Sequence, residues 1–137
     1  WEAGAPTALV GTARADGRAT LERVAADALP PLARWVAEHG HAAAELVDGT
    51  TRLALPGTDA AALVAAPDVR VRLVPLAVRA RTVGVLRLED TGSMALDPTR
   101  QRYLDALGHY AALGVERVRL AADAERVEGL READRLK

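Results

Sequence analysis

Two histidines lie close together in the sequence, at His39 and His41, and imidazole nitrogens are common ligands for zinc and for haem iron. The two residues flank Gly40 at the end of an expected helix, with no cysteine and no acidic cluster beside them. This spacing is poor for two ligands of one metal ion, so we expect an exposed helix cap here. The remaining histidine, His109, lies within another expected helix, where we assign it to packing or to solvent.

Trp35 and two arginines are the residues that best suit recognition of a small molecule. Trp35 is a large ring in a chain with few aromatic residues, so it either fills the core or forms the wall of a pocket. Arg70 and Arg72 alternate with apolar residues and therefore share one face of an expected strand. That face is either solvated or an anion clamp beneath the irregular segment of residues 48–68.

Catalytic patterns are missing from the sequence. There is no Ser/His/Asp spacing, no glycine-rich loop that would hold a phosphate, and no pair of carboxylates in an apolar setting. The absence of cysteine excludes disulfides, thiol catalysis, zinc–thiolate sites and thioether attachment of a chromophore. We therefore expect a domain that is not itself an enzyme.

Composition indicates one soluble domain of 137 residues, half of them apolar. The net charge is −1 and basic residues alternate with acidic ones, so neither nucleic acid nor an anionic membrane surface is an expected partner. No apolar run approaches the roughly 20 residues of a membrane span, and we expect no signal peptide. A cytoplasmic location is expected.

The element that would connect the functional residues is one long helix from Asp97 to Lys137. Asp97 and Pro98 form a strong helix start, because aspartate accepts from first-turn amides and proline fits the first helical position. Apolar or small residues at steps of three and four predict a face that packs on a sheet, namely Leu104, Leu107, Ala111, Gly114, Val118 and Ala121. Ala111 and Gly114 predict a close approach to that sheet.

A second stripe on the same helix predicts a dimer seam. Its members are Leu113, Leu120, Val127 and Leu130. Beyond Asp123 most residues are charged, so this half of the helix is expected to leave the domain and to pair with a second copy of the chain. Polar Arg117 and Asp134 interrupt the seam, which leaves a charged tail without a partner as the alternative.

The other expected elements alternate between hairpins and helices. They are strands over 7–13 and 19–25, a helix from Pro30-Pro31 to Gly40, short strands over 42–47 and 52–55, a short helix before Pro67, and strands over 69–78 and 82–89. This order predicts an α+β domain with an antiparallel sheet and helices on its faces.

Several of these residues resemble a GAF domain. Val74-Pro75-Leu76, the segment 83–88 (VGVLRL) and Leu96-Asp97-Pro98 resemble the usual end of such domains, and the segment 34–40 (RWVAEHG) resembles their middle helix. The resemblance covers roughly residues 5–120 and implies a five- or six-stranded antiparallel sheet with helices on both faces. It implies a sensory domain over 1–120 with a truncated first helix, followed by a charged signalling helix over 121–137.

The end of the chain resembles the connector that precedes the phosphoacceptor helix of bacterial sensor histidine kinases. The similar segments are 113–120 (LGVERVRL) and 131–137, and the potassium-regulating sensor kinases share the tryptophan helix and the Leu55-Pro56 turn. This implies a two-component sensor whose kinase domain follows downstream, in a parent protein that is soluble or membrane-anchored. The alternatives are a ligand-free dimerisation scaffold, or a GAF sensor of a transcription regulator or of a cyclic-dinucleotide enzyme.

The resemblance also limits the ligand. Cyclic-nucleotide GAF domains use a signature with Asn, Lys and Phe, whereas this chain has no Asn, no Phe and no lysine before Lys137. Members that carry bilin or reduce methionine sulfoxide need cysteine. We expect an unknown small molecule between the sheet and residues 48–68, with Trp35, His39, Leu55, Leu63, Arg70 and Arg72 as candidate contacts.

Overall fold

The structure, a computed structural model, describes residues 1, 3–14, 16–89 and 97–136. Its strands are β1 (Thr7–Ala13), β2 (Ala19–Ala25), β3 (Ala43–Leu46), β4 (Thr51–Leu53), β5 (Val69–Val78) and β6 (Arg81–Glu89). Its α-helices are α1 (Pro31–His39), α2 (Ala60–Ala65) and α3 (Pro98–Arg135), and a 3-10 turn, η1 (Ala26–Ala28), precedes α1. The predicted order of elements and the α+β class are confirmed.

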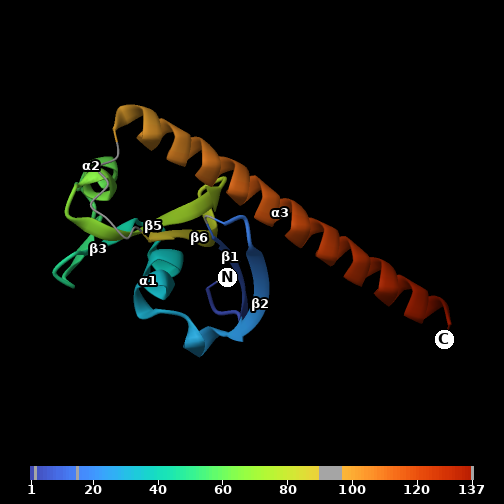
Figure 1. Ribbon diagram of the computed structural model, residues 1–137. Helices are drawn as coiled ribbons and strands as arrows, with labels where there is room; N and C mark the ends of the chain where they lie inside the picture. Colours follow the sequence, from blue (N-terminus) through green and yellow to red (C-terminus); the bar gives the residue numbers. More distant parts are fainter. Residues whose placement is uncertain (2, 15, 90–96, 137) are drawn as a thin grey trace.

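The central layer is an antiparallel sheet with the strand order β4-β3-β5-β6. Helix α1 covers one face of this sheet, while α2 and α3 lie over the opposite face (Figure 1). Helix α1 ends where Gly40 adopts φ 68° and its N–H donates to the carbonyl of Val36 at 2.9 Å, as expected for a glycine cap.

The first hairpin stands apart from the central sheet. Strands β1 and β2 pair from Thr7 opposite Ala25 to Ala13 opposite Ala19, and they form a sheet of their own. The six strands of the expected five- or six-stranded sheet are therefore divided into a two-stranded and a four-stranded sheet, and a cavity of about 540 Å³ lies between β1, β6 and the start of α1. The strands needed for that sheet are present, but β1 and β6 are not paired.

Apolar side chains pack on both faces of the central sheet. Beneath α1 the buried residues are Val36, Ala43, Val71 and Leu73, with Trp35 packed against them. On the other face the buried residues are Ala42, Ala44, Leu46, Ala54, Leu63, Val69 and Leu104 in one cluster, and Leu76, Val83 and Ala112 in a second. The sheet is therefore the middle of three layers.

Helix α3 begins as the sequence predicts and continues without a break for 38 residues. The Asp97 carboxylate accepts from the N–H of Arg100 at 2.8 Å, and Pro98 occupies the first turn. At 1.5 Å per residue the helix is about 57 Å long. Its first half packs on β5 and β6, and its second half extends past the rest of the domain (Figure 1).

The close approach between α3 and the sheet includes Ala111, as predicted, because this residue packs against the cluster of Leu76 and Ala112. It also includes Gly108, where a Cβ atom would lie 3.9 Å from the side chain of Leu76. Gly114 is exposed, and a Cβ there would meet nothing within 4 Å. The prediction for Gly114 is wrong because Gly114 lies two residues after the buried Ala112, about 200° around the helix and therefore on its outer side.

The turn between β5 and β6 holds two residues in the left-handed region. Arg79 has φ 51° and Ala80 has φ 63°, and they connect the paired residues Val78 and Arg81. A two-residue loop with positive φ at both positions suits the right-handed twist of a hairpin, but it favours Asn and Gly. The native residues are therefore strained here.

Replacing Ala80 by glycine should stabilise the protein. The left-handed conformation costs an alanine about 1 kcal/mol more than it costs a glycine. We expect Ala80→Gly to raise the free energy of unfolding in urea by about that amount. The same change at Ala77, an exposed strand residue, should lower it by about 0.5–1 kcal/mol. Equal effects at the two sites would contradict the assignment of strain to the turn.

Aspartates shape the segment between β3 and β5. The Thr50 hydroxyl and the Thr50 amide donate to Asp48 at 2.6 and 2.9 Å, and these hydrogen bonds lower the pKa of the Asp48 carboxyl below its ordinary value. The Asp59 carboxylate accepts from the amides of Ala61 and Ala62 and so caps α2.

Candidate functional site

A cavity of about 520 Å³ lies where β5, the start of α3 and the segment between β4 and α2 meet. Its lining is Gly40, His41, Ala42, Ala54, Leu55, Pro56, Gly57, Thr58, Ala60, Ala61, Val74, Pro75, Gln101 and Asp105. Volumes of this size hold small organic ligands. The lining is mostly small and apolar, and the described residues in it include no arginine or lysine.

The polar groups from α3 lie one helical turn apart. Gln101 and Asp105 flank the buried Leu104, which anchors this part of the helix to the core. The Oε1 atom of Gln101 is buried and accepts no hydrogen bond within the part of the chain that the structure describes. A buried acceptor without a donor costs about 1–3 kcal/mol, so it is a place where a ligand can add a favourable interaction.

The predicted contact residues divide between this cavity and other places. Leu55 lines the cavity, and Leu63 is buried in the adjoining core cluster. Trp35 and His39 lie on α1, on the opposite face of the sheet. Their rings stack at 4.7 Å, and Nδ1 of His39 lies 2.9 Å from the carbonyl oxygen of Trp35. The tryptophan packs against the α1 core instead of facing the cavity.

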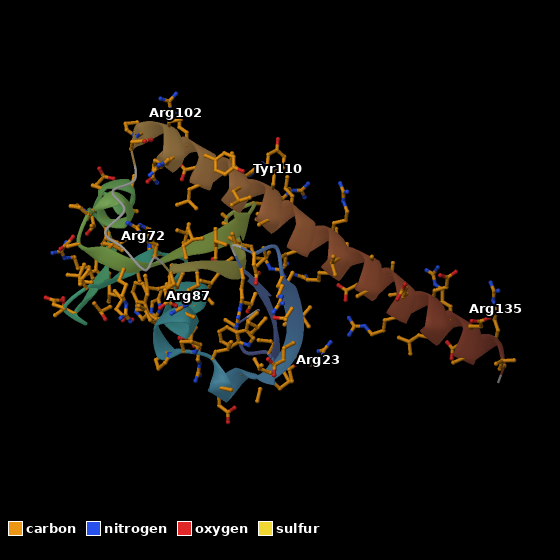
Figure 2. All side chains as sticks on the ribbon, viewed as in Figure 1. Arg23, Arg72, Arg87, Arg102, Tyr110 and Arg135 are labelled. Atoms are coloured by element: carbon orange, nitrogen blue, oxygen red, sulfur yellow. The ribbon has the colours of Figure 1, made fainter. Side chains whose placement is uncertain are left out.

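The two predicted arginines have different surroundings. Arg70 is exposed and pairs with Glu45 at 3.0 Å, whereas Arg72 is 3% exposed and has interactions of its own (Figure 2). Neither residue is part of the cavity lining. The structure therefore does not bring Arg70 and Arg72 together as a shared clamp.

Sequence reasoning did not select Gln101, Asp105 and His41. The available signal was the placement of Gln101 and Asp105 on either side of Leu104, in the first turns of the predicted helix. It was insufficient because the cavity joins residues from four separate parts of the chain. Such contacts have no local pattern.

Two further cavities lie near α1. The one between β1 and β6 is lined by Trp1 and Leu29, and the other, of about 520 Å³, by His39 and Arg81 at the end of α1. Their described linings contain no residue of α3. Of these three cavities, the one at Gln101 is in direct contact with the long helix.

The predicted dimer seam is exposed along α3. Leu113, Leu120, Val127 and Leu130 are 44–65% exposed. Tyr103 and Tyr110 are also exposed, seven residues apart, and Tyr110 points away from the sheet (Figure 2). With Leu113, Leu120 and Val127 they follow steps of seven and three, which extends the seam along the outer side of the helix.

Ion pairs flank the seam. The Asp123 carboxylate lies 2.7 Å from the guanidinium of Arg126, and Arg119 lies 3.8 Å from Glu116 and 3.9 Å from Asp123. Such pairs stabilise an exposed helix by about 0.2–0.5 kcal/mol each. Together with the continuous helical backbone, they favour an extended second half of α3.

The described residues form neither a metal site nor a membrane span. No group of three His, Asp or Glu side chains within the described ranges is placed to hold a metal ion. None of the helices in those ranges combines the length and hydropathy that crossing a bilayer requires.

Comparison with known proteins places the chain in a family. Curated proteins and solved structures give no significant match. A model of the GAF domain family matches residues 8–117, which is most of the chain and nearly the whole range of the resemblance found in the sequence. The match ends within α3, past the residues that line the cavity. The chain therefore belongs to the GAF domains, a family of regulatory and sensory domains.

Proposed function

We propose that this GAF domain binds a small molecule in the cavity at Gln101 and relays the event through α3 to a second copy of itself. The observation that carries the proposal is the course of α3. One continuous helix supplies Gln101 and Asp105 to the cavity and, further along, Leu120 and Val127 to an exposed apolar seam. A movement of its first turns is thereby connected to the seam.

The relay requires a ligand that prefers one position of α3. A ligand shifts an equilibrium between two arrangements only by its difference in affinity for them. Gln101 and Asp105 can provide such a difference because they belong to the helix itself, while Leu55 and Pro56 belong to the opposite wall. A shift of α3 relative to that wall would change both sets of contacts.

The larger protein in this proposal is a bacterial two-component sensor, and the domain is its non-catalytic cytoplasmic sensory part. The resemblance of residues 113–137 to histidine-kinase connectors supports this assignment, as does a charged helix that extends beyond the domain. The gene sequence after Lys137 is the direct test. A phosphoacceptor helix and kinase domain there would agree with it, whereas a DNA-binding or cyclic-dinucleotide domain would assign the chain to another class of regulator.

A single introduced cysteine tests the dimer, because the native chain has none. Ala124 is exposed and lies in the seam series between Leu120 and Val127. In a parallel dimer this position faces its own copy, so oxidised Ala124→Cys should run as a covalent dimer on a non-reducing gel.

Ala122→Cys is the matched control for this experiment. Ala122 is equally small and exposed but lies on the other side of the helix. The Ala122→Cys variant should therefore run as a monomer on the same gel. Equal cross-linking at both positions would indicate random collisions, and absence of cross-linking at Ala124 would contradict a parallel seam.

A ligand-free scaffold is the alternative function. It predicts that side chains fill the space around Trp35 and that the irregular segment has no pocket. Trp35 does pack in the α1 core, whereas a cavity lies beside the irregular segment. The cavity therefore favours sensing.

A further inference from the structure

We propose that the cavity at Gln101 selects ligands that present an ammonium group on a compact apolar body. This inference rests on the proposed function, since it names the ligand class of the same cavity. It is carried by three features of the described lining, which are a buried acceptor without a donor, a carboxylate with no arginine or lysine beside it, and apolar walls.

The acceptor is the Oε1 atom of Gln101. It is buried and without a hydrogen-bond donor from the described chain, although Gln101 lies on the well-anchored first part of α3. The atom has almost no surface open to solvent, so a ligand reaches it only when the Gln101 side chain turns toward the cavity. A ligand N–H then completes the site, because a carboxylate or phosphate would bring another acceptor to it. The site therefore favours a donor.

The charged groups of the cavity lining also favour a ligand with an ammonium group. Asp105 is the carboxylate in the described lining, and its neighbours there include neither arginine nor lysine. No ion pair of Asp105 occurs among those that the structure describes, so its charge is available to a cation. An anionic ligand would be repelled by Asp105, and the described lining offers it no arginine or lysine, only the imidazole of His41. An ammonium group would interact favourably with both Asp105 and Gln101.

The remaining walls suit the apolar part of such a ligand. Leu55 and Pro56 form one side, and Val74 and Pro75 of β5 form another. This arrangement of apolar walls and a few convergent polar groups is typical of small-molecule sites. An amine held by Gln101 and Asp105 would have its body against the sheet and the opposite wall.

Three probes of similar shape and different charge test the inference. They are 2-phenylethylammonium, 2-phenylethanol and 3-phenylpropanoate, each titrated into labelled protein at neutral pH while amide resonances of α3 are followed by NMR. We expect the ammonium probe to bind roughly tenfold more tightly than the carboxylate probe, the effect of one charge-assisted hydrogen bond. Tighter binding of the carboxylate, or no binding of the ammonium probe, would overturn the inference.

Variants locate the binding group. Asp105→Asn should weaken the binding of the ammonium probe by roughly tenfold and leave the binding of the alcohol probe unchanged. Glu125→Gln, which removes the same charge from an exposed position further along α3, is the matched control and should change neither affinity. Equal losses in the two variants would assign the effect to overall charge and contradict a specific site.

The role of Gln101 has a readout in the free protein. Gln101→Leu should weaken the binding of the ammonium probe. It should also raise the thermal unfolding midpoint of the unliganded protein, because it removes a buried acceptor without a partner. A lowered midpoint with unchanged affinity would show that the amide has a structural role only.

Cross-linking of Ala124→Cys with and without the ammonium probe then tests the relay separately. Binding that leaves cross-linking unchanged would support the ligand class and count against the relay.

Discussion

Replacing both Leu120 and Val127 by aspartate is expected to convert the dimer that we propose into a monomer. Both side chains are about half exposed in the isolated chain and lie seven residues apart on the seam. A dimer would bury them, so the double variant loses apolar burial and places carboxylates at an apolar interface. We expect the dissociation constant to rise by at least roughly 100-fold. Sedimentation velocity over a range of concentrations measures this change.

The matched control has the same chemistry on the other side of the helix. Val118 is 66% exposed and Ala122 is exposed, but neither belongs to the seam series. Val118→Asp combined with Ala122→Asp should therefore leave the dimer intact. A seam variant that sediments as an unchanged dimer would contradict the proposal that this face of α3 forms the interface. A native protein that sediments as a monomer would contradict the proposed dimer.

Replacing Leu73 by alanine is expected to have the largest effect on stability. Leu73 is 2% exposed and is among the largest fully buried side chains, between the sheet and α1. Removing its methyl groups leaves a cavity in a layer formed by few residues, so we expect the free energy of unfolding to fall by about 3 kcal/mol. Urea denaturation followed by the fluorescence of Trp35, which packs in the same cluster, measures this loss.

Leu55→Ala is the control for Leu73→Ala. Leu55 is 54% exposed, so the same substitution there should change the free energy of unfolding by less than about 0.5 kcal/mol. A similar loss at both positions would contradict the assignment of the core to the α1 side of the sheet. A fall in the denaturant slope as well as in the midpoint would indicate that α1 separates before the rest unfolds.

The sequence was sufficient for the elements of this fold because their signals are local. Asp97 and Pro98 mark the start of α3, Gly40 marks the end of α1, and alternating residues mark β5 and β6. The division of the strands into two sheets could not be predicted in this way. It depends on the distance between β1 and β6, which no run of neighbouring residues determines.

The candidate site was predicted only in part, for a related reason. Leu55 was identified because its turn is recognisable, but Gln101 and Asp105 gain significance only from the strand and turn that lie opposite them. Arg70 and Arg72 have the same place in an alternating pattern. The structure buries Arg72 and leaves Arg70 exposed, a difference that the pattern does not contain.

The sheet-facing side and the outer side of α3 would both be used in a dimer, and this affects how the dimer would bind its ligand. Leu104, Gly108 and Ala112 face the sheet, while Tyr110 and Leu113 lie on the outer side, so a partner helix on the seam would stay away from the cavity. In such a pair each protomer keeps its own entrance open to solvent. Ligand could therefore enter and leave both halves while the pair remains assembled, and each half would hold a complete site.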